Sequence, residues 1–116
     1  MAELTAGLES GEYTSVELTQ CLLDRITAHN DTLNALLTVT AAEALAAAAK
    51  ADADRAAGNT GVLNGLPIIH KDIFCTRGVR TTCGSKMLDN FISPYDATIV
   101  ERLAGAGAVV LGKANM

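Results

Sequence analysis

The stretch GLPIIHKD, residues 65–72, decides how this chain folds. Proline has no amide proton for a sheet ladder, so Pro67 suits the first residue of a strand, which the apolar pair Ile68-Ile69 continues. Two charged residues, Lys71 and Asp72, follow closely. Polar side chains at the carboxyl end of a strand occupy the edge of an open α/β sheet, where ligands tend to bind. The stretch therefore predicts a short strand with a candidate site at its end.

A helix and another strand are expected after this strand. Asp96 or Thr98 is placed to cap the helix, and Gly105 and Gly107 are placed to end it. The apolar residues of this helix are Ile99, Val100 and Leu103. Ala108–Leu111 then form an apolar run typical of a buried strand. Strand, helix and strand in this order predict an α/β layer in which the two strands pair in parallel.

The residues before GLPIIHKD predict helices. Two leucines four positions apart indicate a short helix within residues 1–10. Thr14 and Glu17 form a T-x-x-E capping box, in which the hydroxyl and the carboxylate satisfy free amides at a helix start. Apolar residues at helical spacing follow, so we expect an amphipathic helix over roughly residues 15–29 that ends near Asn30.

An alanine-rich segment follows this helix. Residues 36–39 predict a short strand. Thr40 and Glu43 repeat the T-x-x-E pattern ahead of an alanine-rich helix, about residues 41–57, which Gly58 stops. Because alanine is small, this helix has a shallow packing face that suits close contact with a larger body.

Composition limits the class of protein. A chain of 116 residues suits one domain. A change of composition divides it into a helical segment, residues 1–60, and the first strands and helix of an α/β core, residues 61–116. Hydrophobic residues make up 49% of the chain and aromatic residues only 3%, as suits aliphatic helices packed on a sheet. The net charge of −4 argues against an autonomous nucleic-acid binder.

The cysteines and the apolar runs favour a cytoplasmic protein. Cys21, Cys75 and Cys83 lack the CxxC spacing of a metal site, so we interpret them as reduced thiols. The first residues do not have the pattern of a signal peptide, and no apolar run approaches the roughly 18 residues of a membrane span. We therefore expect a cytoplasmic location and no metal site.

Lys71 is the candidate for catalysis. Burial of an ammonium group disfavours its charged form and lowers its pKa, so that a buried lysine can act as a general base. A solvated lysine at a strand end is the competing interpretation, and the residues alone favour it.

Three other patterns have simpler explanations. Ser85 follows a glycine, as is common in turns. The segment Gly107–Lys113 fits G-x-x-x-x-G-K, but Ala114 stands where a phosphate-binding loop needs Ser or Thr, and the intervening residues predict a strand. Four scattered basic residues predict a solvated surface or a subunit contact rather than a nucleic-acid site. They are Arg77, Arg80, Lys86 and Arg102.

Longer motifs extend from GLPIIHKD in both directions. They are SVELTQCLLDRI (15–26), LNALLTVTAAEAL (33–45), GLPIIHKDIF (65–74), TRGVRTTCGSKML (76–88) and SPYDATIVERLAGAGAVVLGKANM (93–116). In these motifs the chain resembles the amidase signature family, over about residues 4–116. Within that family it is most similar to the A subunits of the glutamyl-tRNA(Gln), or aspartyl/glutamyl-tRNA, amidotransferases. The resemblance implies an α/β fold: the N-terminal part of a mixed β-sheet flanked by helices, with a leading helical segment.

The resemblance also implies a Ser–Ser–Lys triad in which Lys71 is the base. The lysine deprotonates a bridging serine, which activates a nucleophilic serine that attacks the side-chain amide of glutamine. In the family both serines lie in a Gly/Ser-rich run downstream of the GKANM-like segment, and the 116 residues contain no such run. Many relatives have a small or aliphatic residue where His70 stands and Asn where Ile73 stands. We expect His70 to be a packed or solvent-facing strand residue.

The partners and cofactors are implied in the same way. The family's A subunit works in a heterotrimer with B and C subunits, meets charged tRNA through that complex, and supplies ammonia for converting Glu-tRNA(Gln) to Gln-tRNA(Gln). No cofactor is expected in this chain, because ATP and Mg²⁺ are used by the B subunit.

Two other hypotheses remain open. The second hypothesis is that the chain is a fragment of a stand-alone amidase-signature enzyme that hydrolyses a small carboxamide without tRNA or partners. A truncated module without catalysis is the third possibility. In each case we expect no glutaminase activity from the 116 residues alone, because the resemblance places both triad serines outside them.

Overall fold

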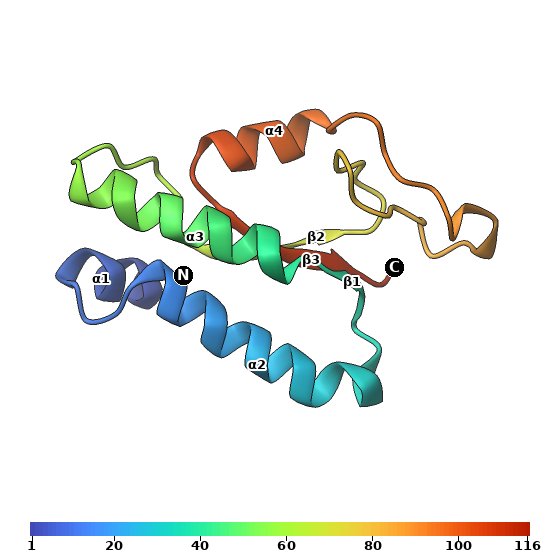
Figure 1. Cartoon of the computed structure of the whole chain (residues 1–116), viewed down its shortest axis with the longest axis horizontal. Coiled ribbons are helices and arrows are strands. Elements are labelled where there is room, and N and C mark those ends of the chain that lie inside the picture. Colours follow the sequence, from blue (N-terminus) through green and yellow to red (C-terminus); the bar gives the residue numbers. More distant parts are fainter.

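A computed structural model describes all 116 residues and shows a small sheet with helices on both sides (Figure 1). The elements in chain order are α1 (Ala2–Ser10), α2 (Ser15–Leu33), β1 (Leu36–Val39), α3 (Ala41–Ala56), β2 (Pro67–Lys71), a 3-10 helix (Lys86–Leu88), α4 (Thr98–Gly105) and β3 (Val109–Ala114). The mixed α/β class is therefore confirmed. None of the helices combines the length and the apolar character that crossing a membrane requires.

The three strands form one sheet in the order β1-β3-β2. The central strand, β3, pairs antiparallel with β1 and parallel with β2. This confirms the predicted parallel pairing of the strands on either side of α4. It also brings a strand from the first 60 residues into the same sheet as the strands that follow them.

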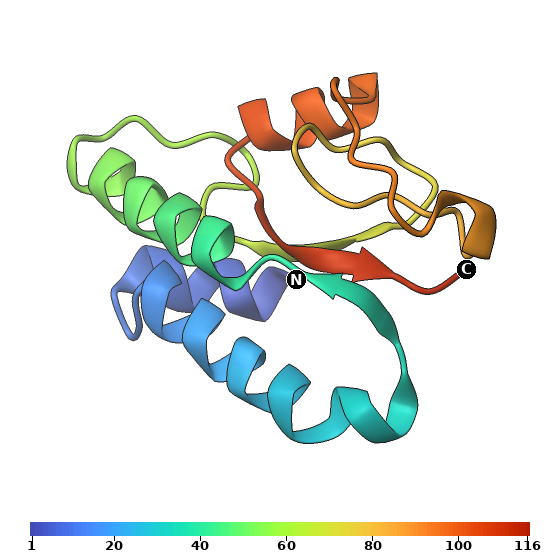
Figure 2. The same ribbon diagram turned by 45° about the vertical axis from the view of Figure 1, so that its right-hand side comes forward.

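Helices α2 and α3 cover one face of the sheet, while α4 and the long segment 72–97 lie over the other face (Figure 2). The core of the first face comprises Leu23, Ala44, Ala48, Val109 and Leu111. Because alanine is small, α3 comes close enough to β3 that the side chain of Ala48 is fully buried. The shallow packing face expected for the alanine-rich helix is thus present.

The first predicted capping box is present, and the second is not. The Thr14 hydroxyl accepts a hydrogen bond from the Glu17 amide, and the Glu17 carboxylate accepts one from the Thr14 amide at 2.8 Å. At the start of α3, Thr40 makes no side-chain cap bond with Glu43. Its hydroxyl instead donates to the carbonyl of Val110 at 3.1 Å, which ties the helix start to the sheet.

Two helix boundaries differ from the sequence prediction. Helix α2 runs about one turn past Asn30 and ends where Asn34 adopts the left-handed conformation, with φ 48°. The residue that caps α4 is Ala97, not Asp96, and it makes no side-chain cap bond. The Asp96 carboxylate accepts a hydrogen bond from the amide of Arg77 at 2.7 Å, so it holds the loop rather than the helix.

A β-bulge in the central strand turns Lys113 away from α2 and α3. While β2 advances two residues, from Ile68 to His70, its partner β3 advances three, from Val110 to Lys113. An extra residue of this kind changes the face toward which the following side chains point. Leu111 therefore packs on the α2–α3 face, whereas Lys113 is directed into the segment after β2.

Candidate active site

Lys71 is the last residue of β2, and its side chain is exposed. Its Cα pairs with that of Ala114 across the parallel ladder. Side chains alternate along a strand, so Lys71 shares a face with Ile69. Ile69 lines an apolar groove between α2 and the sheet, together with Leu33 and Leu111. The expected position at the carboxyl end of a strand is thus observed, but the 116 residues do not bury this amine.

Lys113 is the lysine that the fold buries, with a side chain that is 0% exposed. Its Nζ donates to the carbonyl of Phe74 at 2.7 Å and to the hydroxyl of Thr81 at 2.9 Å, and lies 3.5 Å from a carboxylate oxygen of Asp72. Burial lowers the pKa of the Lys113 amine, while the charge of Asp72 opposes that shift. From the sequence, Lys113 is expected only as the last residue of a segment that fits the phosphate-binding pattern G-x-x-x-x-G-K. The structure places Lys113 within β3, so this segment is a strand and not a phosphate-binding loop.

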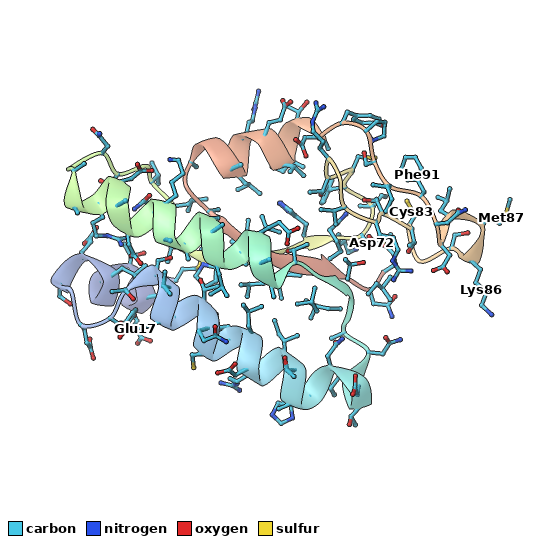
Figure 3. All side chains as sticks on the ribbon, in the orientation of Figure 1. Glu17, Asp72, Cys83, Lys86, Met87 and Phe91 are labelled. Atoms are coloured by element: carbon cyan, nitrogen blue, oxygen red, sulfur yellow. The ribbon has the colours of Figure 1, made fainter.

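Asp72 connects the end of β2 to the segment that returns over it. The carboxylate is fully buried, and one of its oxygens accepts hydrogen bonds from the amide and the hydroxyl of Thr82. Its other oxygen accepts no hydrogen bond and lies 3.5 Å from the Lys113 ammonium. The backbone amide of Asp72 donates to Ala114, and its carbonyl accepts from Cys83, both at 3.0 Å. In Figure 3, Asp72 lies beside the end of β2.

His70 is a buried neighbour of Lys113. The side chain is 3% exposed, and its Cα pairs with that of Lys113 across the two strands. The imidazole meets the ring of Phe74 edge-on, at 6.4 Å between ring centroids. Burial, and then the charge of Lys113, lower the pKa of His70. Its Nε2 has no hydrogen-bond partner, so His70 is the packed strand residue that we expected.

The serines have structural roles. Ser85 caps the 3-10 helix Lys86–Leu88, where its hydroxyl accepts a hydrogen bond from the amide of Met87 at 3.2 Å. The hydroxyls of Ser10, Ser15 and Ser93 donate to backbone carbonyls. None of the four hydroxyls is hydrogen-bonded to Lys71.

The basic side chains do not form a common patch. Arg77 lies 3.8 Å from Asp96, and Arg80 forms an ion pair with Asp89 at 2.5 Å. Arg80 also donates to the carbonyl of Leu37. In Figure 3, Lys86 projects from the tip of segment 72–97, far from Asp72. These contacts favour the predicted solvated surface.

At the end of β2, the amine of Lys71 is exposed, and hydrogen bonds hold the backbone of the residues that follow it. A lysine amine accepts a proton from a neighbouring hydroxyl when it is neutral. The buried carboxylate of Asp72 is occupied by Lys113 and Thr82, so it is not free to act as a second base. The end of β2 therefore presents an exposed amine that has no hydroxyl hydrogen-bonded to it.

Comparison with known proteins agrees with this geometry. The family model described as Amidase matches residues 17–116. The A subunit of the glutamyl-tRNA(Gln) amidotransferase of Alkalilimnicola ehrlichii is 59% identical over 116 residues, which are 100% of this chain and 24% of that protein. The corresponding subunit of Halorhodospira halophila is 60% identical over the same shares. The chain thus spans about a quarter of the length of the curated relatives it matches.

Solved structures show the same fold. The native peptide amidase of Stenotrophomonas maltophilia superimposes with a TM-score of 0.90 at 40% identity. The match covers 97% of this chain and 24% of the peptide amidase. The arrangement of β2, β3 and the segment between them is therefore shared with a protein whose name states that it acts on peptide amides.

Proposed function

The chain belongs to the amidase family, and from that membership we propose that it is part of the glutamine-hydrolysing subunit of a tRNA-dependent amidotransferase. The observation that carries the proposal is the identity of 59% and 60%, across all 116 residues, with the A subunits of two glutamyl-tRNA(Gln) amidotransferases. Identity with the peptide amidase is lower, at 40%. The exposed amine of Lys71 at the end of β2 supports a catalytic role at this position.

Lys71 acts in this proposal as a general base. In its neutral form, the amine takes a proton from a bridging serine, which in turn takes the proton of a second serine. The second serine attacks the carbonyl carbon of the glutamine side-chain amide and forms an acyl-enzyme. The proton returns through the bridging serine to the departing nitrogen, which leaves as ammonia. Both serines come from residues other than these 116, and water then releases glutamate.

The partners and cofactors follow from the same proposal. Ammonia passes to a B subunit, where ATP and Mg²⁺ serve to activate Glu-tRNA(Gln) before its amidation. A C subunit completes the heterotrimer, which works in the cytoplasm. The charged tRNA is bound by the complex, which is consistent with the net charge of −4 on this chain and its scattered basic residues.

The test is an assay of the complete protein with its B and C subunits. We expect glutamine-dependent ammonia release and conversion of Glu-tRNA(Gln) to Gln-tRNA(Gln), both abolished by Lys71→Ala. Lys86→Ala is the matched control, because Lys86 is also an exposed lysine but lies at the tip of the segment between β2 and α4. It should keep full activity.

The opposite outcomes separate the rival hypotheses. Hydrolysis of small carboxamides by the protein alone, without tRNA amidation in the complex, would identify a stand-alone amidase. Full activity of Lys71→Ala would remove the catalytic assignment of this lysine.

A further inference from the structure

The most unusual feature outside the proposed chemistry is a fully buried ion pair. Lys113 and Asp72 have side chains that are both 0% exposed, and Lys113 is the largest fully buried side chain of the chain. Removing two charges from water costs several kcal/mol for each ion, so a buried pair stabilises a fold little more than an apolar pair of the same size.

The pair holds the backbone that directly follows Lys71. The Lys113 ammonium contacts the Asp72 carboxylate and donates to the Phe74 carbonyl, one and three residues beyond Lys71. The Phe74 amide in turn donates to the carbonyl of Lys71 at 3.1 Å. One buried amine from β3 thus fixes the turn in which β2 ends.

The same ammonium also binds the returning segment. It donates to the Thr81 hydroxyl, while the partner carboxylate accepts from the amide of Thr82. The turn after Lys71 is therefore held between β3 below it and residues 81–83 beside it. Without the charge pair, the turn after β2 and residues 81–83 lose a common anchor.

Lys113 cannot be the reacting base itself. The bulge in β3 directs it to the face covered by segment 72–97, whereas the side chain of Lys71 lies on the opposite face of β2. No solvent reaches the Lys113 amine. It acts on the site only through the backbone of residues 72–74.

We propose that Lys113, paired with Asp72, is a positioning residue that sets the direction in which Lys71 leaves the sheet. This inference rests on the proposed function of Lys71 as the base. A displacement of about 1 Å in a reacting group lowers a rate by about 100-fold, so backbone support of this kind is reflected in turnover more than in substrate binding.

The experiment uses the complete protein in complex with its B and C subunits and compares Lys113→Met with Lys50→Met. Methionine keeps most of the volume of lysine but removes its charge and donors. Lys50 is an exposed lysine paired with Asp54, so its variant controls for the loss of a lysine. The readouts are kcat and KM for glutamine and the pH profile of kcat/KM.

We expect Lys113→Met to lower kcat about 10- to 100-fold with KM changed less than twofold. The pH profile should also change, because the backbone that carries the Lys71 amine is no longer held in the same position. Lys50→Met should match the unmodified protein. A kcat of Lys113→Met within twofold of the unmodified protein, or an unmoved pH profile, overturns the inference.

A second variant covers the case in which Lys113→Met fails to fold because it leaves Asp72 as an unpaired buried charge. In Lys113→Met combined with Asp72→Asn, no charge is left, and the asparagine oxygen still accepts from Thr82. We expect this protein to fold and to show the same loss of kcat. Normal activity of the double variant, or its failure to fold, shows that the pair serves folding alone and overturns the inference.

The two proposals fail in different ways. If the unmodified complex shows no glutaminase activity, or Lys71→Ala keeps it, the proposed function is wrong. If both of those results are as expected and Lys113→Met behaves like the unmodified protein, only the positioning role is wrong.

Discussion

The carboxylate of Asp52, near the end of α3, accepts a hydrogen bond at 2.8 Å from the backbone amide of Ser15, the first residue of α2. Its second oxygen accepts from the amide of Val16 at 3.1 Å. A side chain of one helix thus satisfies two free amides at the start of another, and its negative charge meets the positive end of that helix dipole. Arg55 holds the carboxylate in place from one turn further along α3.

We predict that Asp52→Ala lowers the free energy of unfolding by about 2 kcal/mol, as loss of a strong N-terminal cap does. Asp54→Ala is the matched control, since Asp54 lies on the same helix and pairs only with the exposed Lys50. Exposed pairs of this kind contribute little, so the control should change stability by less than about 0.5 kcal/mol. Urea unfolding measures both, and equal effects of the two substitutions would contradict the capping role.

Gly107 provides a second prediction about the fold. It has φ +88°, and a Cβ atom added there would lie 2.8 Å from the Cα of Asn64. Gly107→Ala therefore combines the strain of a left-handed alanine, about 1 kcal/mol, with a clash against backbone. Gly58 also has a positive φ, of +78°, but has nothing within 4 Å of its added Cβ.

The comparison of the two glycines separates strain from crowding. We expect Gly58→Ala to cost only about 1 kcal/mol of unfolding free energy, and Gly107→Ala to cost clearly more. The crowding at Gly107 is absent if thermal unfolding gives the same midpoint for both variants.

Much of this fold is predictable because its signals are local. The capping box of Thr14 and Glu17 and the helix propensity of the alanines act within one turn of the chain. The parallel strands follow from Pro67 and the apolar run before Gly112. The position of Lys71 at a strand end is predictable for the same reason.

The features that the sequence did not predict depend on contacts between residues that are distant along the chain. Thr40 has the sequence of a helix cap, but a carbonyl 70 residues away competes for its hydroxyl. The burial of Lys113 depends on a bulge between paired strands, which no single stretch of sequence shows. Thr81 meets the Lys113 ammonium only because of that bulge. Gly112 is the one residue in the sequence that indicates close packing near the bulge. A Cβ atom at this position would clash with the carbonyl of Thr38 on the neighbouring strand.

The buried state of Lys113 predicts its chemical reactivity. The four lysines are Lys50, Lys71, Lys86 and Lys113. Under native conditions we expect an amine-acylating reagent to modify Lys50 and Lys86, which are exposed, at least tenfold faster than Lys113. Peptide mass spectrometry measures the modification, and in denaturant all lysines should react alike. Native acylation of Lys113 at the rate of Lys86 would show that the ion pair is open to solvent.

His70 predicts a loss of stability in weak acid. Burial, and then the charge of Lys113, hold its pKa in the folded protein below the value of about 6.5 found in unfolded chains. Between these two pKa values the unfolded chain binds more protons than the folded one, so acid favours unfolding. The stabilisation is fully present above pH 6.5 and is lost as the pH falls through the folded pKa.

The control for this prediction is the other histidine. We expect the unfolding free energy to fall between pH 7 and pH 5 with a slope of at most about 1.4 kcal/mol per pH unit, the value for one proton. His70→Leu should flatten this slope, because a neutral side chain no longer has to be protonated on unfolding. His29→Leu should leave it nearly unchanged, because His29 is exposed on α2. Urea unfolding at several pH values measures the slopes, and an unchanged slope in His70→Leu would mean that another group causes the acid sensitivity.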